Sequence, residues 1–170
     1  SLEATCGLWG SSFMVLSRGI SPEVAAQWIS LFYMGITFGR FISGFLTIKI
    51  SSSRMIQIGQ GLIAVSILLI LLPSKGFVLC TGLFLAGIGC APIYPCMIHQ
   101  TPENFGRELS QAMIGMQMAC AYVGTTFMPP LFGLLAEKVS INLYPYYLLA
   151  ALVFMAITTE SLRKTVKKTV

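Results

Sequence analysis

The stretch that decides the fold is GITFGRFISGFL, residues 35–46, in which one arginine stands among apolar residues and glycines. Arg40 follows sixteen uncharged residues, 24–39, and precedes eight more, 41–48. A run of this length exceeds the roughly 20 apolar residues that a helix needs to cross a bilayer. Because an arginine that faces lipid costs about 2.5 kcal/mol or more, Arg40 requires a polar partner or a water-filled cavity.

The composition of the whole chain fits the same environment. Hydrophobic residues make up 55% of the sequence and charged residues 10%, whereas soluble domains carry about 25% charged residues. A net charge of +5 would suggest a nucleic-acid partner in a soluble protein, but in a membrane protein it indicates basic residues gathered on one face of the bilayer. We therefore expect a membrane protein that contacts the lipid bilayer and binds no nucleic acid.

Charged residues divide the chain into uncharged stretches joined by short connections. Five stretches are long enough to cross a bilayer, and the first, 4–17, is shorter and resembles the end of a sixth helix. In the first connection, Ser21 is a candidate N-cap and Pro22 a candidate first helical residue. The sequence predicts an all-α, polytopic membrane protein in one domain, with helices at 1–17, 22–48, 54–73, 76–99, 107–136 and 141–161.

Lysine and arginine predict the orientation. Alternating spans put seven basic residues on one side of the membrane and three on the other. The larger group marks the cytoplasmic side, so we expect a multi-pass protein of the cell (plasma or inner) membrane with a cytoplasmic C-terminus. The first group is Lys49, Arg54, Arg107, Arg163, Lys164, Lys167 and Lys168, and the second is Arg18, Lys75 and Lys138.

Two rows of small residues are spaced for close helix packing. Gly35, Gly39 and Ser43 recur every four residues, and Gly115 and Ala119 repeat that spacing. Small residues let two helix backbones approach closely in lipid, where apolar burial alone does not drive association. Both rows therefore predict tight helix–helix contacts.

The order of four motifs resembles the C-terminal half of a major facilitator superfamily transporter, and is most similar to the fucose-permease-like sugar:proton symporters. The motifs are EATCGLWGSSFMV (3–15), SPEVAAQWISLFYMGITFGRFISGFL (21–46), GIGCAPIYPCMIHQTPENFG (87–106) and IGMQMACAYVGTTFMPPLFGLLAE (114–137). The resemblance implies a six-helix half of that fold with its first helix truncated, and an N-terminal six-helix half that is missing here. Ile48 stands where the superfamily loop commonly has an acid.

Two charged residues are candidates for proton coupling or gating. Arg40 lies about 12 Å along the helix from Ile48, at 1.5 Å per residue, and so within the bilayer. Its alternatives are snorkelling to the head groups or a purely structural cap. Glu3 is the acid that the resemblance places well inside a span, where burial would let a carboxylate bind and release a proton. Its alternative is an exposed residue near a helix end.

Sugar binding requires aromatic faces and a few well-placed polar groups. Gln117 lies about 15 Å into its helix, near the bilayer midplane, where an amide needs a partner or water. Pro92 and Pro95 predict a bend beside Tyr94, and such bends often line cavities. Tyr144, Tyr146 and Tyr147 fit an interfacial belt. The substrate-binding candidates are Gln117, Tyr94, Trp9, Tyr33, Phe32 and Tyr122.

The favoured function is secondary active transport, with proton-coupled uptake of a sugar or a similar small polar solute by alternating access. An alternative is an efflux carrier for amphipathic compounds, which predicts a wide cavity rich in methionine and phenylalanine; the chain has nine methionines. A further alternative is an inactive fragment that lacks the first half. The five cysteines form no CxxC pair and there is one histidine, so we expect no metal site, no cofactor and no enzyme.

Overall fold

The computed structural model describes residues 1–73 and 76–169, and within these ranges it is helical with no β-strand. Five segments are long and apolar enough to cross a membrane. They confirm the predicted all-α, multi-pass membrane architecture. The elements are α1 (Leu2–Arg18), α2 (Pro22–Leu46), α3 (Ser52–Leu71), α4 (Phe77–Cys90), α5 (Ile93–Lys138), the short 3-10 helix η1 (Ile141–Leu143) and α6 (Tyr144–Thr169).

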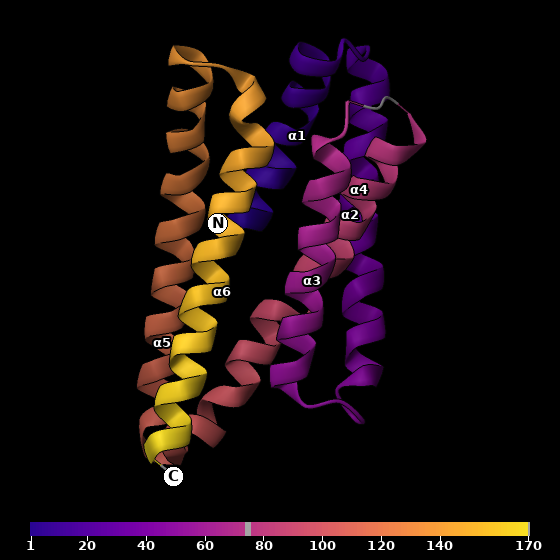
Figure 1. Cartoon of the computed structure of the whole chain (residues 1–170). Helices are drawn as coiled ribbons and strands as arrows, with labels where there is room; N and C mark the ends of the chain where they lie inside the picture. Colours follow the sequence, from indigo (N-terminus) through magenta and orange to yellow (C-terminus); the bar gives the residue numbers. More distant parts are fainter. Residues whose placement is uncertain (74–75, 170) are drawn as a thin grey trace.

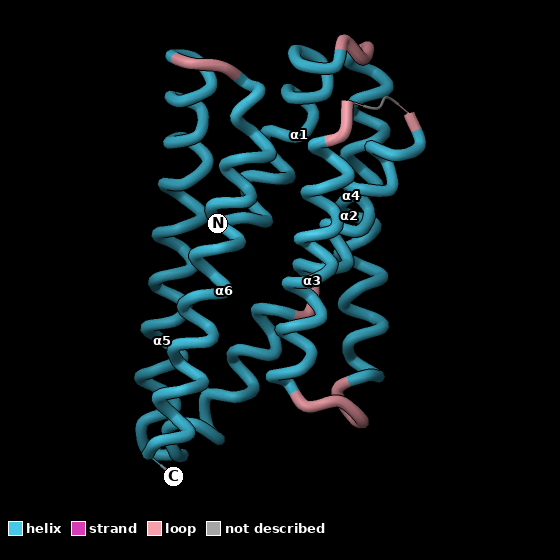
Figure 2. The backbone as a smooth tube through the Cα atoms, in the orientation of Figure 1, coloured by secondary structure: helices cyan, strands magenta, loops and turns pink. Residues whose placement is uncertain are grey.

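The helices run up and down between two ends of an elongated bundle (Figures 1 and 2). The turn after α2 and the C-terminus lie at one end, which we call the Lys49 end, and the α5–α6 connection lies at the opposite Lys138 end. Arg18, which ends α1, also lies at the Lys138 end. The basic residues that fall outside the description are Lys75 and the side chains of Arg107, Lys167 and Lys168.

Two breaks separate the middle of the chain into spans. The bend predicted beside Tyr94 is present, because α4 ends at Cys90 and α5 begins after Pro92. The direction then reverses at Gly106, whose φ of 74° and ψ of 165° favour glycine. The helix expected over 76–99 therefore continues to Gly106 as one span, and α5 contains a first segment, 93–105, and a second segment, 107–138.

Backbone contact between α2 and α4 forms the tightest part of the bundle. A β-carbon on Gly35 would lie 3.2 Å from the Cα of Gly87 and would overlap the carbonyl oxygen of Phe84. A β-carbon on Gly87 would likewise overlap the carbonyl oxygen of Phe32. Since only glycine permits this approach, the first predicted row of small residues packs as expected. The second row does not: a β-carbon on Gly115 would meet nothing within 4 Å.

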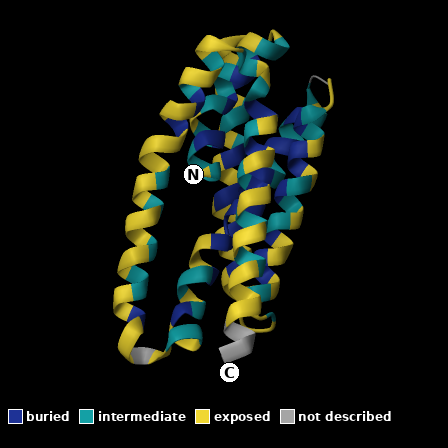
Figure 3. Ribbon diagram, turned by 60° about the vertical axis from the view of Figure 1, so that its left-hand side comes forward, coloured by how far each residue is buried: buried dark blue, intermediate teal, exposed yellow. Residues whose placement is uncertain are grey.

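Burial is uneven across the bundle. The core is densest between α2, α3 and α4 and extends to α1 and the start of α6, whereas the second segment of α5 is exposed along most of its length (Figure 3). The buried residues hold α1 to α4 together. The second segment of α5 is joined to these helices mainly through the turn at Gly106 and through contacts near the Lys138 end. This open arrangement positions the cavity described below.

The prediction of an interfacial tyrosine belt is wrong for Tyr144. Its side chain is fully buried, and its hydroxyl donates to the carbonyl oxygen of Cys6 at 3.1 Å. Its ring stacks on Phe13 with centroids 4.9 Å apart. Tyr144 therefore ties α6 to α1, because the short helix η1 turns the chain inward before α6 begins. Tyr146, at 59% exposure, is free to meet lipid or head groups.

Candidate functional site

A cavity of about 810 Å³ lies between the start of α1, both segments of α5 and the middle of α6. We call it the methionine cavity. It forms where α5 turns away at Gly106, since the two segments diverge and α6 packs against only one side. The lining residues are Ser1, Leu2, Tyr94, Met97, Met113, Met116, Gln117, Cys120, Ala121, Met128, Leu131, Tyr147, Ala150, Ala151, Phe154, Met155 and Thr158.

Thioether side chains dominate this lining. Met113 and Met116 lie one turn apart on α5, and Met97, Met128 and Met155 complete the set from other positions. Methionine is unbranched, polarizable and flexible, so a surface of this kind adapts to apolar ligands of different shape. The arrangement can therefore hold an apolar body without fixing its outline.

Gln117 supplies the amide of the cavity, and a hydrogen bond from Thr101 fixes its side chain. The hydroxyl of Thr101 donates to Oε1 of Gln117 at 3.1 Å, and Thr101 itself is buried. This bond joins the two segments of α5 across the turn at Gly106. Gln117 thus lines the methionine cavity with an amide whose oxygen is already bound by Thr101.

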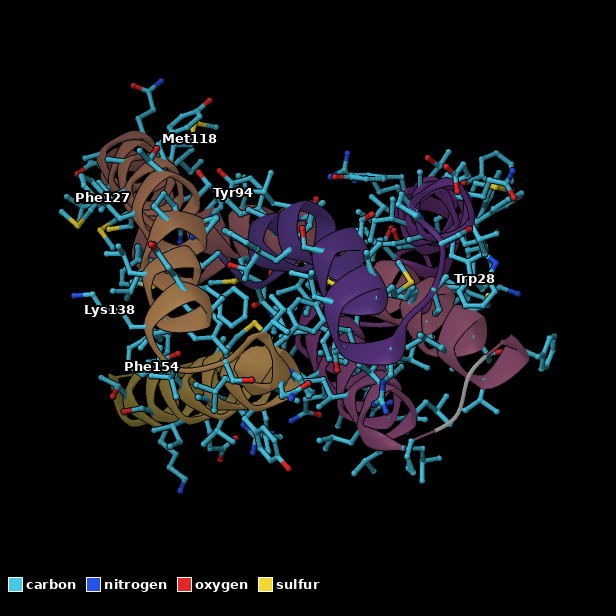
Figure 4. The ribbon with its side chains drawn as sticks, turned by 90° about the horizontal axis from the view of Figure 1, so that it is seen from above. Trp28, Tyr94, Met118, Phe127, Lys138 and Phe154 are labelled. Atoms are coloured by element: carbon cyan, nitrogen blue, oxygen red, sulfur yellow. The ribbon has the colours of Figure 1, made fainter. Side chains whose placement is uncertain are left out.

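Tyr94 lies on the same side of the molecule as Gln117. Figure 4, seen from above, shows Tyr94 on the side formed by α5 and α6, with Trp28 on the opposite side. Tyr94 follows Pro92, where α4 gives way to α5, and is 40% exposed. The structure therefore brings together two of the predicted substrate-binding residues, Gln117 and Tyr94, in the methionine cavity.

The two charged candidates form an ion pair. Nη2 of Arg40 lies 3.6 Å from Oε1 of Glu3, with side-chain exposures of 60% and 42%. Figure 1 shows the N-terminus about half-way between the two ends of the bundle, so the first turn of α1, which carries Glu3, lies away from both ends. A carboxylate at this distance neutralises the guanidinium and supplies the polar partner that Arg40 requires.

The side chains of Trp9 and Phe32 pack against neighbouring helices of the bundle. Nε1 of Trp9 donates to the carbonyl oxygen of Pro129 at 2.9 Å, and its ring meets Phe132 edge to face at 5.6 Å. Phe32 is fully buried beside Gly87. Neither residue lines the methionine cavity. The ring of Phe32 lies on the other side of α2, beside Gly7 of α1.

Tyr33 and Tyr122 face away from the methionine cavity. Tyr33 is 54% exposed on α2 and its hydroxyl lies beside Gly7 of α1, on the helix pair that also carries Arg40 and Glu3. Tyr122 is 72% exposed on the second segment of α5. The six substrate-binding candidates are thus divided among the methionine cavity, the α1–α2 pair, the packed core and an outer surface, and their roles in binding stay predictions.

Comparison with protein families identifies the chain. The family model of the Major Facilitator Superfamily matches residues 4–167. The chain belongs to the major facilitator superfamily. No curated protein and no solved structure matched it. As a major facilitator superfamily protein it is a multi-pass membrane protein, and this family implies transport of a small solute across a lipid bilayer.

Sequence reasoning missed most of the lining of this superfamily member's cavity. Met113 and Met116 are three residues apart, which puts them on one helix face. That spacing was the one feature of the sequence that could have identified them as cavity residues. Met128, Met155 and Thr158 carried no such feature, because they reach the cavity only after the chain reverses at Gly106 and again at η1.

Proposed function

We propose that this major facilitator superfamily protein transports an amphipathic solute by alternating access, with the apolar part of the solute bound in the methionine cavity. The observation that carries the proposal is the lining by five thioether side chains and one amide, which matches the efflux alternative better than a sugar site. A sugar needs a hydrogen-bond partner for most of its hydroxyls, and Tyr147 already donates its hydroxyl to the carbonyl oxygen of Met128 at 3.0 Å.

Transport requires a second surface on which the cavity closes. Superfamily carriers combine two six-helix lobes with the solute site between them. Apolar side chains stand exposed on α2, among them Phe41 and Phe45, and on α5, among them Phe127. We propose that a second six-helix lobe packs near these faces, and we expect the present helices alone to bind solute without transporting it.

The charge distribution supports one orientation. Lys49 and Arg54 lie at the Lys49 end with Arg163 and Lys164. Following the positive-inside rule, the Lys49 end and the C-terminus face the cytoplasm of a cell membrane.

The Glu3–Arg40 pair supports coupling to protons. Protonation of Glu3 would remove its charge and leave Arg40 without a partner at membrane depth, so the two helices would favour a different arrangement. The same pair favours a second candidate function, which is proton-coupled uptake of a sugar or similar polar solute, as in the fucose-permease-like symporters. The solute would then bind on the α1–α2 surface that carries Glu3, Arg40 and Tyr33.

One experiment separates the two candidate functions. Cells that express these helices together with the proposed second six-helix lobe are loaded with a fluorescent amphipathic dye and, in parallel, supplied with a labelled hexose. Our proposal predicts faster loss of dye than in control cells and no additional hexose uptake. Hexose accumulation without dye extrusion would favour the sugar symporter and would contradict the proposal.

A further inference from the structure

A second cavity of about 500 Å³ lies at the Lys49 end. We call it the polar cavity. Its walls come from the first turns of α3, the end of the first segment of α5, and the last turns of α6. It shares Met97, Gln117 and Thr158 with the methionine cavity. The two cavities are therefore neighbours, with Gln117 at their boundary.

Hydrogen bonds between helices hold the walls of the polar cavity. Nε2 of Gln100 on α5 donates to the hydroxyl of Ser53 on α3 at 2.7 Å. Nε2 of Gln60 on α3 donates to the hydroxyl of Thr159 on α6 at 3.2 Å. These two bonds fix α3 against both α5 and α6, so the cavity is a built feature of the fold and not a gap between loosely placed helices.

One positive charge of the polar cavity lacks compensation. The guanidinium of Arg163 is paired with Glu160 at 2.9 Å. Within residues 1–73 and 76–169, Arg54 has no ion pair or hydrogen bond, and neither has Gln57 or Asn104. Arg54 and Gln57 lie three residues apart on α3 and so share a face. The cavity thus offers a guanidinium fork and two amides that no protein group occupies.

We infer that the polar cavity binds the anionic head group, a carboxylate or a phosphate ester, of the solute whose apolar body occupies the methionine cavity. This inference rests on the proposed transport of an amphipathic solute and adds the sign of its charge. The guanidinium of Arg54 matches a carboxylate or phosphate in geometry as well as charge. Gln57 and Asn104 supply neutral donors beside it, and Gln117 lies where head and body join.

The test measures binding of two matched probes to the protein in phosphatidylcholine nanodiscs. One is a dansyl-labelled long-chain carboxylate, and the other is the same chain with a trimethylammonium head. We expect the carboxylate to bind the protein about tenfold more tightly, as one charge-assisted contact implies. Arg54→Gln should remove that preference, and Arg54→Lys, which keeps the charge without the fork, should retain part of it.

Lys49→Gln is the matched control, because Lys49 lies at the same end of the bundle outside both cavities. It should leave the affinity for the carboxylate probe unchanged. Equal affinity of the two probes, or equal weakening by Arg54→Gln and Lys49→Gln, would overturn the inference and leave amphipath transport standing. Failure of both probes to bind would overturn both proposals.

Competition separates a bound amphipath from a free anion. Acetate and inorganic phosphate carry the head-group chemistry without a chain, so we expect them to displace the carboxylate probe only weakly. If either small anion displaced the probe at the concentration at which a non-fluorescent long-chain carboxylate does, the polar cavity would be a site for free anions and the inference would be wrong.

Discussion

Nη2 of Arg40 lies 3.6 Å from Oε1 of Glu3, so the arginine that stands within α2 is paired with an acid in the first turn of α1. Both side chains keep substantial contact with solvent or with whatever covers this face. A half-exposed ion pair contributes less than about 1 kcal/mol to stability. Its importance therefore lies in the charge it balances at membrane depth rather than in holding α1 to α2.

Glu3→Gln should abolish the pH dependence of transport with little effect on folding. Glutamine resembles the protonated acid, so Arg40 is left permanently without an anionic partner. The measurement is the rate of dye extrusion by these helices together with the proposed second lobe across a range of external pH, with surface expression as the check on folding. Glu137→Gln is the control, because Glu137 lies at the Lys138 end away from the ion pair. Unchanged pH dependence in Glu3→Gln would exclude the pair from coupling.

Met116→Gln should weaken binding of an amphipathic solute several-fold. The substitution keeps the length of the side chain but replaces apolar contact area with an amide, a loss of about 1 kcal/mol. Met118→Gln makes the same chemical change on the same helix at a residue that does not line the cavity. Fluorescence titration of the two variants gives the comparison. Equal loss in both would mean that the lining of the cavity is not where the solute binds.

Thr101→Val should lower stability by about 1 kcal/mol, the usual net value of one hydrogen bond. The hydroxyl of Thr101 also lies 3.1 Å from the carbonyl oxygen of Met97, so Met97 and Gln117 share its single proton, and its removal affects the first segment of α5 as well. A double-mutant cycle with Gln117→Leu isolates the Thr101–Gln117 term. Strictly additive effects of the two substitutions on the unfolding temperature would show that the bond does not couple the segments of α5.

Gly87→Ala should destabilise the bundle by about 1–3 kcal/mol, the typical cost of overpacking. The added methyl group would overlap the carbonyl oxygen of Phe32 and force α2 away from α4. Gly115→Ala adds the same methyl group where nothing lies within 4 Å, and should leave stability equal or raise it by about 0.5–1 kcal/mol through helix propensity. Thermal unfolding in detergent measures both. A Gly87→Ala variant as stable as the wild type would contradict the packing described for α2 and α4.

The sequence predicted the spans because the bilayer imposes one simple requirement, a long apolar run with few charges; residues 24–46 meet it with Arg40 as their one charged residue, and residues 55–71 carry none. The cap at Ser21 was also predictable: its side chain accepts from the amide of Val24 at 3.5 Å, with Pro22 following it. Local signals of this kind need no knowledge of neighbouring helices.

The candidate site was predicted only in part, because its members meet through tertiary structure. Gln117 was singled out from its depth in a helix, but its partner Thr101 lies across the reversal at Gly106. The sequence indicated that Arg40 needs a polar partner, but no pattern in the residues around Arg40 identified Glu3 as that partner. Tyr144 carried the pattern of a belt residue, yet the turn of η1 buries it against Cys6.

The central claim, that the methionine cavity holds the apolar part of a solute, is tested most directly at Cys120. This thiol is exposed and lines the cavity, whereas Cys6, Cys90 and Cys96 are buried. In a Cys80→Ser background, the rate at which N-ethylmaleimide alkylates Cys120 is measured with and without solute. We predict that a long-chain amphipath slows the reaction and that a hexose does not. Protection by the hexose together with no protection by the amphipath would contradict the account.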